Sequence, residues 1–200
     1  MAYGKAIELF LVNGTADSLI TAELSNWNGK AIKIPRTEVS GCNRDDVKGA
    51  GVYFLICQED DGTDSVYIGE AENVQDRLVQ HLREYQSGKE KYYWNTAVIF
   101  VGRDLNKALI RYLENRFVEI ARECGRYAVL TKNTYKNTVM KESQIASMEE
   151  FIDNVKILIN TLGYKVLVPA PKATDDTVYL YCKGSGASAT GFVSIGGFTV

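Results

Sequence analysis

Residues 51–88 read GVYFLICQEDDGTDSVYIGEAENVQDRLVQHLREYQSG, and the strongest indications of the fold come from this segment. Two runs rich in β-branched and aromatic residues, 51–57 and 65–69, flank an Asp-Gly pair that is typical of a hairpin turn. We expect these runs to pair as antiparallel strands. Because side chains alternate between the two faces of a strand, Tyr53 and Tyr67 can then meet on one face of the hairpin.

The segment after the second run predicts a helix that carries a cation and an imidazole. Asn73 is a good N-cap, apolar residues recur at helical spacing after it, and Gly88 is a suitable stop. Arg77 and His81 lie four residues apart, beside the apolar stripe of this helix. We therefore expect both side chains to point toward the sheet that the stripe covers.

A second predicted helix supplies a carboxylate. It runs between Asp104, the expected N-cap, and Gly125, the expected stop, and it has an apolar stripe at helical spacing. Glu114 borders that stripe and has apolar residues as its helical neighbours, so its carboxylate is expected to be partly desolvated. A carboxylate in such a setting needs a partner, which is either a cation such as Arg111 or a bound metal ion.

The order of these groups resembles that of the GIY-YIG nuclease superfamily, which includes the catalytic domain of a DNA-repair excinuclease and many homing and restriction endonucleases. GVY stands at the first tyrosine motif, with Val52 in place of isoleucine, and VYIG stands at the second. Arginine, histidine and glutamate follow in family order. Asn133 is the better candidate for the asparagine that completes the set, and Asn137 is the other.

The resemblance implies an α+β fold of the GIY-YIG type, with a small central antiparallel β-sheet flanked by helices. It also implies a metal-dependent endonuclease, a hydrolase that cuts the phosphodiester bonds of DNA in repair, restriction or defence. The implied catalytic residues are Tyr53, Tyr67, Arg77, His81, Glu114 and Asn133. Glu114 would hold one Mg²⁺ or Mn²⁺ ion per site, and Asn133 would brace the metal shell or the substrate.

The other implied roles divide the work of phosphodiester hydrolysis. Arg77 would share the phosphate charge with the metal ion, and Tyr67 would orient the phosphate or the leaving group. Tyr53 would help to deprotonate the attacking water, with His81 as a candidate relay. A free phenol titrates near about 10 and is a poor base at neutral pH, so the identity of the formal base stays open.

Charge is distributed unevenly along the chain. The net charge is −2, and the sequence pI of about 5.6 has the wrong sign for a protein that binds nucleic acid without specificity. Residues 76–141, in contrast, contain thirteen Lys or Arg against seven Asp or Glu. The candidates for phosphate contact in this segment are Lys89, Lys91, Lys107, Arg111 and Lys132. Trp94 is a candidate for base stacking, and core packing is its alternative role.

The chain is expected to have four parts. Residues 1–45 contain three strand-like runs separated by Asn-Gly pairs and predict an N-terminal β-hairpin or meander extension. The nuclease domain follows at 46–168 and closes with a helix near 147–162. A Pro-containing linker at 169–177 leads to 178–200, the start of a C-terminal β-rich domain that its short length marks as truncated. The first and last parts resemble segments of a bacterial subgroup of the superfamily, a leader and a domain of unknown function.

Composition predicts the setting of the protein. No run of about 18 apolar residues is present to span a membrane, and the N-terminus lacks a basic stretch followed by a long apolar one. The four cysteines have no paired metal spacing, which favours reduced thiols and a cytoplasmic location. The alternative function is a non-catalytic nucleic-acid-binding module that uses the nuclease fold for recognition. Oligomeric state, the choice of DNA or RNA, and the substrate form stay open.

Overall fold

The computed structural model describes residues 3–58, 62–134, 139–171, 177–194 and 197–199 of a mixed α+β chain. The chain divides into two compact units, Met1–Val168 and Pro169–Val200. The first unit contains the motif residues.

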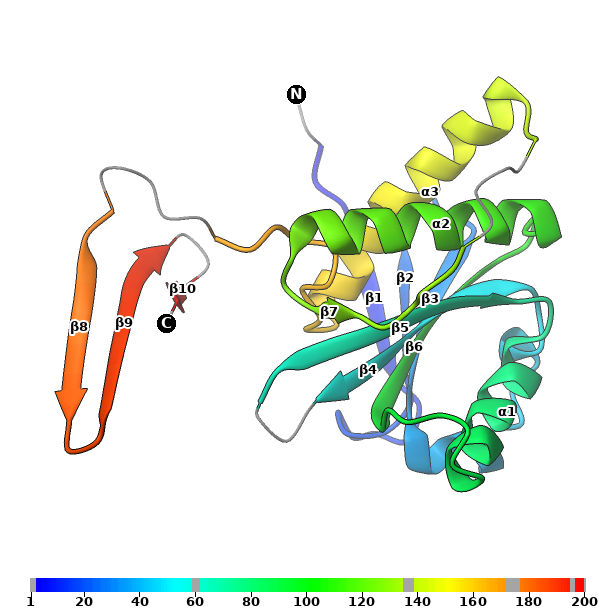
Figure 1. The fold of residues 1–200 in the computed structure, drawn as a ribbon. Helices are drawn as coiled ribbons and strands as arrows, with labels where there is room; N and C mark the ends of the chain where they lie inside the picture. The colour runs from blue at the N-terminus through cyan, green and yellow to red at the C-terminus, as the bar shows by residue number, and fades with distance from the viewer. Residues whose placement is uncertain (1–2, 59–61, 135–138, 172–176, 195–196, 200) are drawn as a thin grey trace. The chain divides into compact units, whose positions relative to one another are not determined.

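A seven-stranded sheet forms the centre of the first unit, with strand order β1-β2-β3-β6-β4-β5-β7 (Figure 1). Its strands are β1 (Ile7–Leu11), β2 (Ile20–Leu24), β3 (Gly29–Pro35), β4 (Gly51–Gln58), β5 (Asp64–Ala71), β6 (Trp94–Gly102) and β7 (Ala128–Val129). All neighbours are antiparallel except β5 and β7. The predicted N-terminal meander is present as β1 to β3, and its last strand pairs with β6, so the sheet is larger than the small central sheet that we expected.

Within its described residues, three α-helices and two short 3₁₀ helices complete this unit. The α-helices are α1 (Val74–Gln86), α2 (Lys107–Cys124) and α3 (Glu142–Thr161), and the 3₁₀ helices are η1 (Arg36–Gly41) and η2 (Asp45–Val47). Helix α1 begins as predicted, because the Asn73 side chain accepts a hydrogen bond from the backbone N–H of Asp76. Helix α3 begins five residues before the predicted start, because its first turn is polar and lies ahead of the apolar stripe that guided the prediction.

The predicted N-cap of α2 was wrong. The cap is Asn106, whose side-chain oxygen accepts hydrogen bonds from the backbone N–H groups of Ala108 and Leu109. Asp104 instead accepts a hydrogen bond from the side chain of Asn28, at 3.3 Å. The predicted stop at Gly125 is confirmed, with a backbone φ of 63° in the left-handed region that favours glycine.

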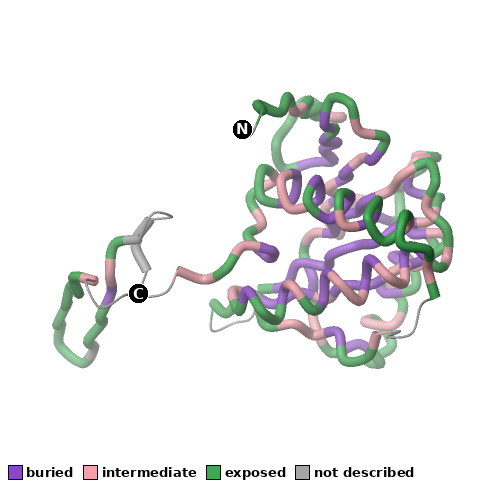
Figure 2. Tube along the Cα trace, turned by 90° about the horizontal axis from the view of Figure 1, so that it is seen from above, coloured by how far each residue is buried: buried purple, intermediate pink, exposed green. Residues whose placement is uncertain are grey.

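The two faces of the sheet are covered by different helices. Val52, Phe54 and Ile56 of β4 belong to a core cluster that includes residues of α2 and α3, whereas Tyr53 and Leu55 belong to a second cluster with residues of α1 and η1. Figures 1 and 2 show this layering, with buried residues concentrated along the strands and on the helix sides that face them. The GVY motif therefore lies inside the molecule, and its tyrosine faces α1.

The second unit contains an antiparallel three-stranded sheet of order β10-β9-β8. Its strands are β8 (Tyr179–Gly184), β9 (Ala187–Ser194) and β10 (Gly197–Thr199). This agrees with the β-rich character expected of the C-terminal segment.

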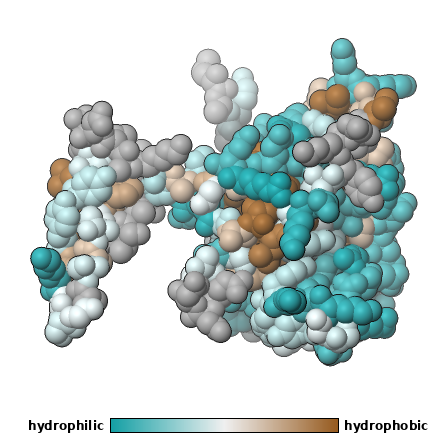
Figure 3. All heavy atoms as spheres, in the orientation of Figure 1, coloured by the Kyte–Doolittle hydropathy of each residue, from teal (hydrophilic) through white to brown (hydrophobic). Residues whose placement is uncertain are grey.

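The surface, the helices and the cysteines bear on the setting of the protein. In the view of Figure 3 the first unit is largely hydrophilic, with hydrophobic residues in limited areas. Among the described residues, no helix combines the length and the apolar character needed to cross a membrane. All four cysteines are free thiols.

Candidate active site

The β4–β5 hairpin brings two tyrosines together on one face of the sheet. Tyr53 lies opposite Gly69, and Tyr67 lies opposite Leu55, so the two phenols are diagonal neighbours. Their ring centroids are 6.2 Å apart, and the ring planes meet at 28°. The predicted contact between the tyrosines is confirmed.

In each of the two motifs, the surrounding atoms leave no room for a side chain at the glycine. A Cβ atom on Gly69 would lie 2.4 Å from the Tyr53 hydroxyl oxygen, so that hydroxyl occupies the space that any side chain at this position would fill. A Cβ atom on Gly51 would lie 2.6 Å from the carbonyl oxygen of Phe100, where β4 approaches β6 closely. Gly69 is therefore part of the geometry that holds Tyr53, although it carries no functional group.

His81 projects from α1 into this tyrosine pair. Its side chain is 1% exposed, and its Nε2 atom lies 3.0 Å from the Tyr53 hydroxyl. The imidazole also packs edge-on against both phenol rings, with centroid distances of 5.6 Å to Tyr53 and 5.3 Å to Tyr67. The prediction that His81 points toward the sheet is confirmed.

The other ring nitrogen of His81 binds a residue that the sequence reasoning missed. Nδ1 lies 2.5 Å from a carboxylate oxygen of Glu90, a side chain that is 6% exposed. Glu90 follows α1 in a turn held by two backbone hydrogen bonds to the carbonyl oxygen of Glu84. Nothing in the local sequence distinguishes Glu90, because it stands between the exposed residues Lys89 and Lys91 and reads as part of a solvated charge run.

Arg77 lies one helical turn before His81 and is half-buried. Its guanidinium pairs with Glu84 at 3.4 Å. Burial alone would lower the pKa of Arg77, but the neighbouring Tyr53, Tyr67 and Glu84 raise it on balance, so this side chain stays cationic. The prediction that Arg77 points toward the sheet is supported by this electrostatic coupling with Tyr53 and Tyr67.

Burial dominates the titration of the two phenols. Desolvation raises the pKa of Tyr53 well above its ordinary value and also raises the pKa of Tyr67, while the charge of Arg77 lowers both. Tyr92 stacks on the outer side of Tyr67, with centroids 5.6 Å apart and an interplanar angle of 16°. Both phenols are therefore neutral at physiological pH.

Glu114 lies on α2 and is 7% exposed, which confirms the predicted desolvation. Its pKa is raised to about 7, chiefly by burial and also by the negative charge of Glu70, while Lys107 and Arg111 act in the opposite direction. Glu114 also raises the pKa of Tyr53 and Tyr67, so its carboxylate belongs to the same neighbourhood.

The cation expected beside Glu114 has another partner. Arg111 Nε lies 3.9 Å from Glu70, and Lys107 Nζ lies 2.9 Å from the second oxygen of that carboxylate. Among the described residues, Glu114 forms no ion pair. Glu70 was missed because an acidic residue directly after a YIG motif, near the end of a strand, reads as a solvated strand end.

The predicted asparagine lies after β7. Asn133 is exposed, and within the described part of the chain no hydrogen bond or ion pair joins it to the other five motif residues. Its segment is fixed beside β5 by Thr131, whose hydroxyl accepts from the N–H of Ile68 at 2.8 Å and donates to the carbonyl of Ile68 at 2.7 Å. Asn137 lies outside the described residues.

The candidate substrate-binding residues are in different environments. Lys89, Lys91 and Lys132 are exposed, whereas Lys107 and Arg111 pair with Glu70. Trp94 is fully buried, and the guanidinium of Arg36 lies 4.6 Å from its ring centroid. The ring of Trp94 is therefore not exposed for base stacking, and the core-packing alternative describes its role.

No protein-family model, curated protein or solved structure matches the chain. The resemblance to GIY-YIG nucleases consequently rests on the order of the motif residues and on the contacts among them.

Two arrangements of acidic residues bear on metal binding. His81, Glu84 and Glu90 have potential ligand atoms within 4.8 Å of one another, but the imidazole nitrogens of His81 already contact Tyr53 and Glu90. At the other arrangement, Glu70 and Glu114 repel each other electrostatically in a partly desolvated setting. Oxygen donors of this kind suit a hard divalent cation, which would relieve the repulsion.

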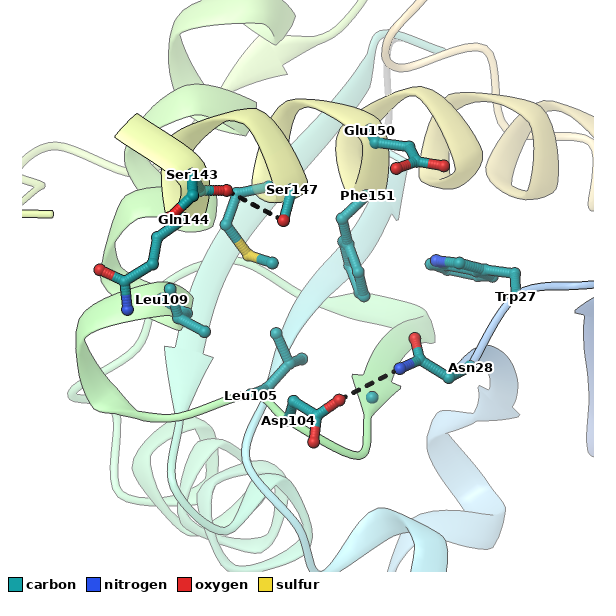
Figure 4. Close-up of a pocket in the computed structure, with 12 residues that line it drawn as sticks. Trp27, Asn28, Asp104, Leu105, Leu109, Ser143, Gln144, Ser147, Glu150 and Phe151 are labelled. Atoms are coloured by element: carbon teal, nitrogen blue, oxygen red, sulfur yellow. Dashed lines mark hydrogen bonds between the residues drawn. The ribbon is translucent and has the colours of Figure 1, made fainter. Parts of the chain in front are cut away.

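A separate cavity of about 410 Å³ lies between α2, α3 and the loop before β3. Figure 4 shows Trp27 and Phe151 facing each other in it, with ring centroids 4.9 Å apart, and the hydrogen bond from Asn28 to Asp104 at its edge. None of the six predicted catalytic residues lines this cavity.

Proposed function

We propose that this protein is a metal-dependent endonuclease of the GIY-YIG type that hydrolyses the phosphodiester bonds of DNA. The observation that carries the proposal is the 3.0 Å contact between the Tyr53 hydroxyl and His81 Nε2 in the face-sharing pair of tyrosines. Strand alternation, helical spacing and the order of the motifs led us to expect these three residues together. Their contact supports a shared catalytic role more strongly than the separate packing of each ring would.

Tyr53 acts as a proton carrier in this proposal. Because burial raises the pKa of its phenol well above the ordinary value, a standing phenolate is disfavoured at neutral pH. The neutral phenol can instead accept a proton from the attacking water while it donates its own proton to His81 Nε2. The 3.0 Å separation is within hydrogen-bond reach, as a concerted transfer requires.

Charge stabilisation falls to Arg77 and Glu114. Arg77 remains cationic and lies beside both phenols, where it would interact with the phosphate oxygens and stabilise the charge that develops on them. Glu114, with Glu70 nearby, offers the oxygen donors for one Mg²⁺ or Mn²⁺ ion. Such an ion would supply Lewis-acid stabilisation of the phosphate and of the leaving oxygen. Tyr67 would orient the phosphate, and Asn133 would brace the substrate.

The experiment that tests the proposal is cleavage of end-labelled duplex, single-stranded and branched DNA in Mg²⁺, Mn²⁺ or EDTA. Wild type is compared with Tyr53→Phe, Glu114→Ala and the control Glu119→Gln. Glu119 is a suitable control because it lies on the same helix as Glu114 but is exposed and pairs with Arg116. DNA binding is measured in parallel by fluorescence anisotropy.

We expect wild type and the control to cut DNA only with a divalent ion. Tyr53→Phe and Glu114→Ala should reduce the rate by at least about 1,000-fold while DNA binding is retained. A wild-type protein that binds DNA and cuts none of the three forms would reject the nuclease function in favour of a recognition module.

A further inference from the structure

We propose that Glu90 is the positioning residue of a Glu90–His81–Tyr53 proton relay, a role that rests on the proposed nuclease function. The three groups form a continuous chain, from the carboxylate to Nδ1 at 2.5 Å and from Nε2 to the phenol at 3.0 Å. Both ring nitrogens of His81 are therefore occupied, each by a group of different chemistry. A neutral imidazole has one donor and one acceptor nitrogen, so the partners decide which nitrogen carries the proton.

The chemistry of Glu90 selects one tautomer. An ionised carboxylate can only accept a hydrogen bond, so Nδ1 must carry the proton in the contact with Glu90. Nε2 then presents its lone pair to the Tyr53 hydroxyl, which donates. This is the direction needed for Tyr53 to pass its proton to His81 as it takes one from water. In the opposite tautomer Nε2 would donate to Tyr53, and the imidazole could not accept that proton.

Because it is buried, the Glu90 carboxylate also stabilises the protonated form of His81. The Oε1 atom of Glu90 is buried and has no hydrogen-bond partner among the described residues. When His81 receives the proton, the imidazolium forms beside a desolvated anion, where the attraction is stronger than in water. An incompletely satisfied buried carboxylate is costly to the folded state, which argues for a functional reason for its presence.

The surroundings favour a relay over a metal site built from the same residues. Glu84, the third member of the cluster with His81 and Glu90, already pairs with Arg77. A metal ion on Nδ1 would also have to replace the short contact with Glu90. Among the described residues, the rings of Tyr53 and Tyr67 also pack edge-on against the imidazole.

The first measurement is the tautomer of His81 in the full chain. The chain has a single histidine, so ¹⁵N-histidine labelling gives one imidazole whose two nitrogens can be assigned by two-dimensional NMR. In mildly alkaline buffer we expect Nδ1 to be protonated and Nε2 to be an unprotonated acceptor. In Glu90→Gln the side-chain amide can donate to Nδ1, so the opposite tautomer should become the major form.

The second measurement is the rate of DNA cleavage by Glu90→Gln beside the control Glu119→Gln, which removes one exposed carboxylate charge. We expect kcat to fall by at least about 100-fold in Glu90→Gln with KM changed less than about threefold, because a tautomer error affects only the transition state. Glu90→Asp, which keeps the carboxylate, should recover part of the loss. The melting temperature verifies that each variant folds.

The outcomes separate this proposal from the nuclease proposal. If wild type cuts no DNA but its Nδ1 proton depends on Glu90, the nuclease function fails and the positioning contact stands. If wild type cuts DNA and Glu90→Gln cuts equally fast with an unchanged tautomer, the positioning role is overturned. A metal-bound Nδ1 signal that EDTA removes would overturn it as well.

Discussion

The two sides of the β4–β5 hairpin handle their polar groups in different ways. On the α1 side, hydrogen bonds join Tyr53 to His81 and His81 to Glu90. On the α2 side, Glu114 forms no ion pair within the described residues, and the nearest bases pair with Glu70 instead. A connected chain of donors and acceptors suits proton transfer, whereas a carboxylate left short of positive charge suits cation binding.

Two glutamates on helix α2, Glu114 and Glu119, differ in burial, and this difference explains the contrast between the two sides. Glu114 is buried and its pKa is raised to about 7, whereas Glu119, five residues later, is exposed and pairs with Arg116. The two carboxylates have the same chemistry and lie on the same helix. Their position relative to the apolar stripe therefore decides which one can be functional.

Beyond the active-site substitutions already described, the largest effect is expected from Gly69→Ala, which disturbs the α1 side. The new Cβ atom would lie 2.4 Å from the Tyr53 hydroxyl, which has no room to move because it is buried and bonded to His81. We expect cleavage to fall by at least about 100-fold and the free energy of unfolding to fall by about 1 to 3 kcal/mol. Cleavage assays and urea denaturation measure the two changes.

Gly49→Ala is the matched control for that substitution, since no atom lies within 4 Å of a Cβ atom at position 49. Its cleavage rate should equal that of wild type. Equal activity of Gly69→Ala and Gly49→Ala would show that the exact place of the Tyr53 hydroxyl does not matter.

The next effect concerns the α2 side and is the pH dependence of stability caused by Glu114. The folded-state pKa of Glu114 is raised from 4.5 to about 7, so the folded state holds this proton more tightly than the unfolded state does. Stability should therefore fall as pH rises through that window, by about 2 kcal/mol after allowance for partial solvent screening. Glu114→Gln should lack this loss in urea denaturation, and Glu119→Gln should keep it.

Addition of Mg²⁺ tests the Glu114 carboxylate at alkaline pH, where this group is ionised. Binding to the folded state should raise the melting temperature of wild type and leave that of Glu114→Gln unchanged. An identical response of the two proteins would separate Glu114 from the metal site.

A smaller effect concerns the start of α2, which sets the position of Glu114. Asn106→Ala removes the side-chain acceptor for two backbone N–H groups and should lower the free energy of unfolding by about 1 kcal/mol. Asp104→Ala should cost less than about 0.5 kcal/mol, because Asp104 only accepts a bond from Asn28 at the surface. Reversal of this order in chemical denaturation would restore Asp104 as the cap.

The smallest effect compares lysines on the two sides. Lys89 is exposed beside Glu90, whereas Lys107 is paired with Glu70. We expect Lys89→Ala to weaken DNA binding about threefold and to reduce the salt dependence of log K by about 0.9, the value for one phosphate contact. Lys107→Ala should leave that slope unchanged in anisotropy titrations. A larger slope change in Lys107→Ala would place the DNA path over α2.

Much of the site could be predicted because its residues follow local periodicities. The alternation along β4 and β5 puts Tyr53 and Tyr67 on one face, and helical spacing puts His81 beside the stripe that covers them. The same reasoning identified Glu114 as desolvated. It failed for Asp104 because two neighbouring residues were both competent caps, and only the surrounding contacts chose Asn106.

The sequence alone predicted the β4–β5 hairpin, the helices α1 and α2 and the faces of their motif residues, since these depend on periods of two and 3.6 residues. It did not predict the N-cap of α2 or the first turn of α3. Tertiary structure alone decided the partners. Glu90 meets His81 through the turn after α1, Glu70 takes the bases of α2, and β3 joins the central sheet by pairing with β6. Such contacts depend on which residues the fold brings close in space. The local sequence around an acidic residue is the same whether its side chain is solvated or buried against an imidazole.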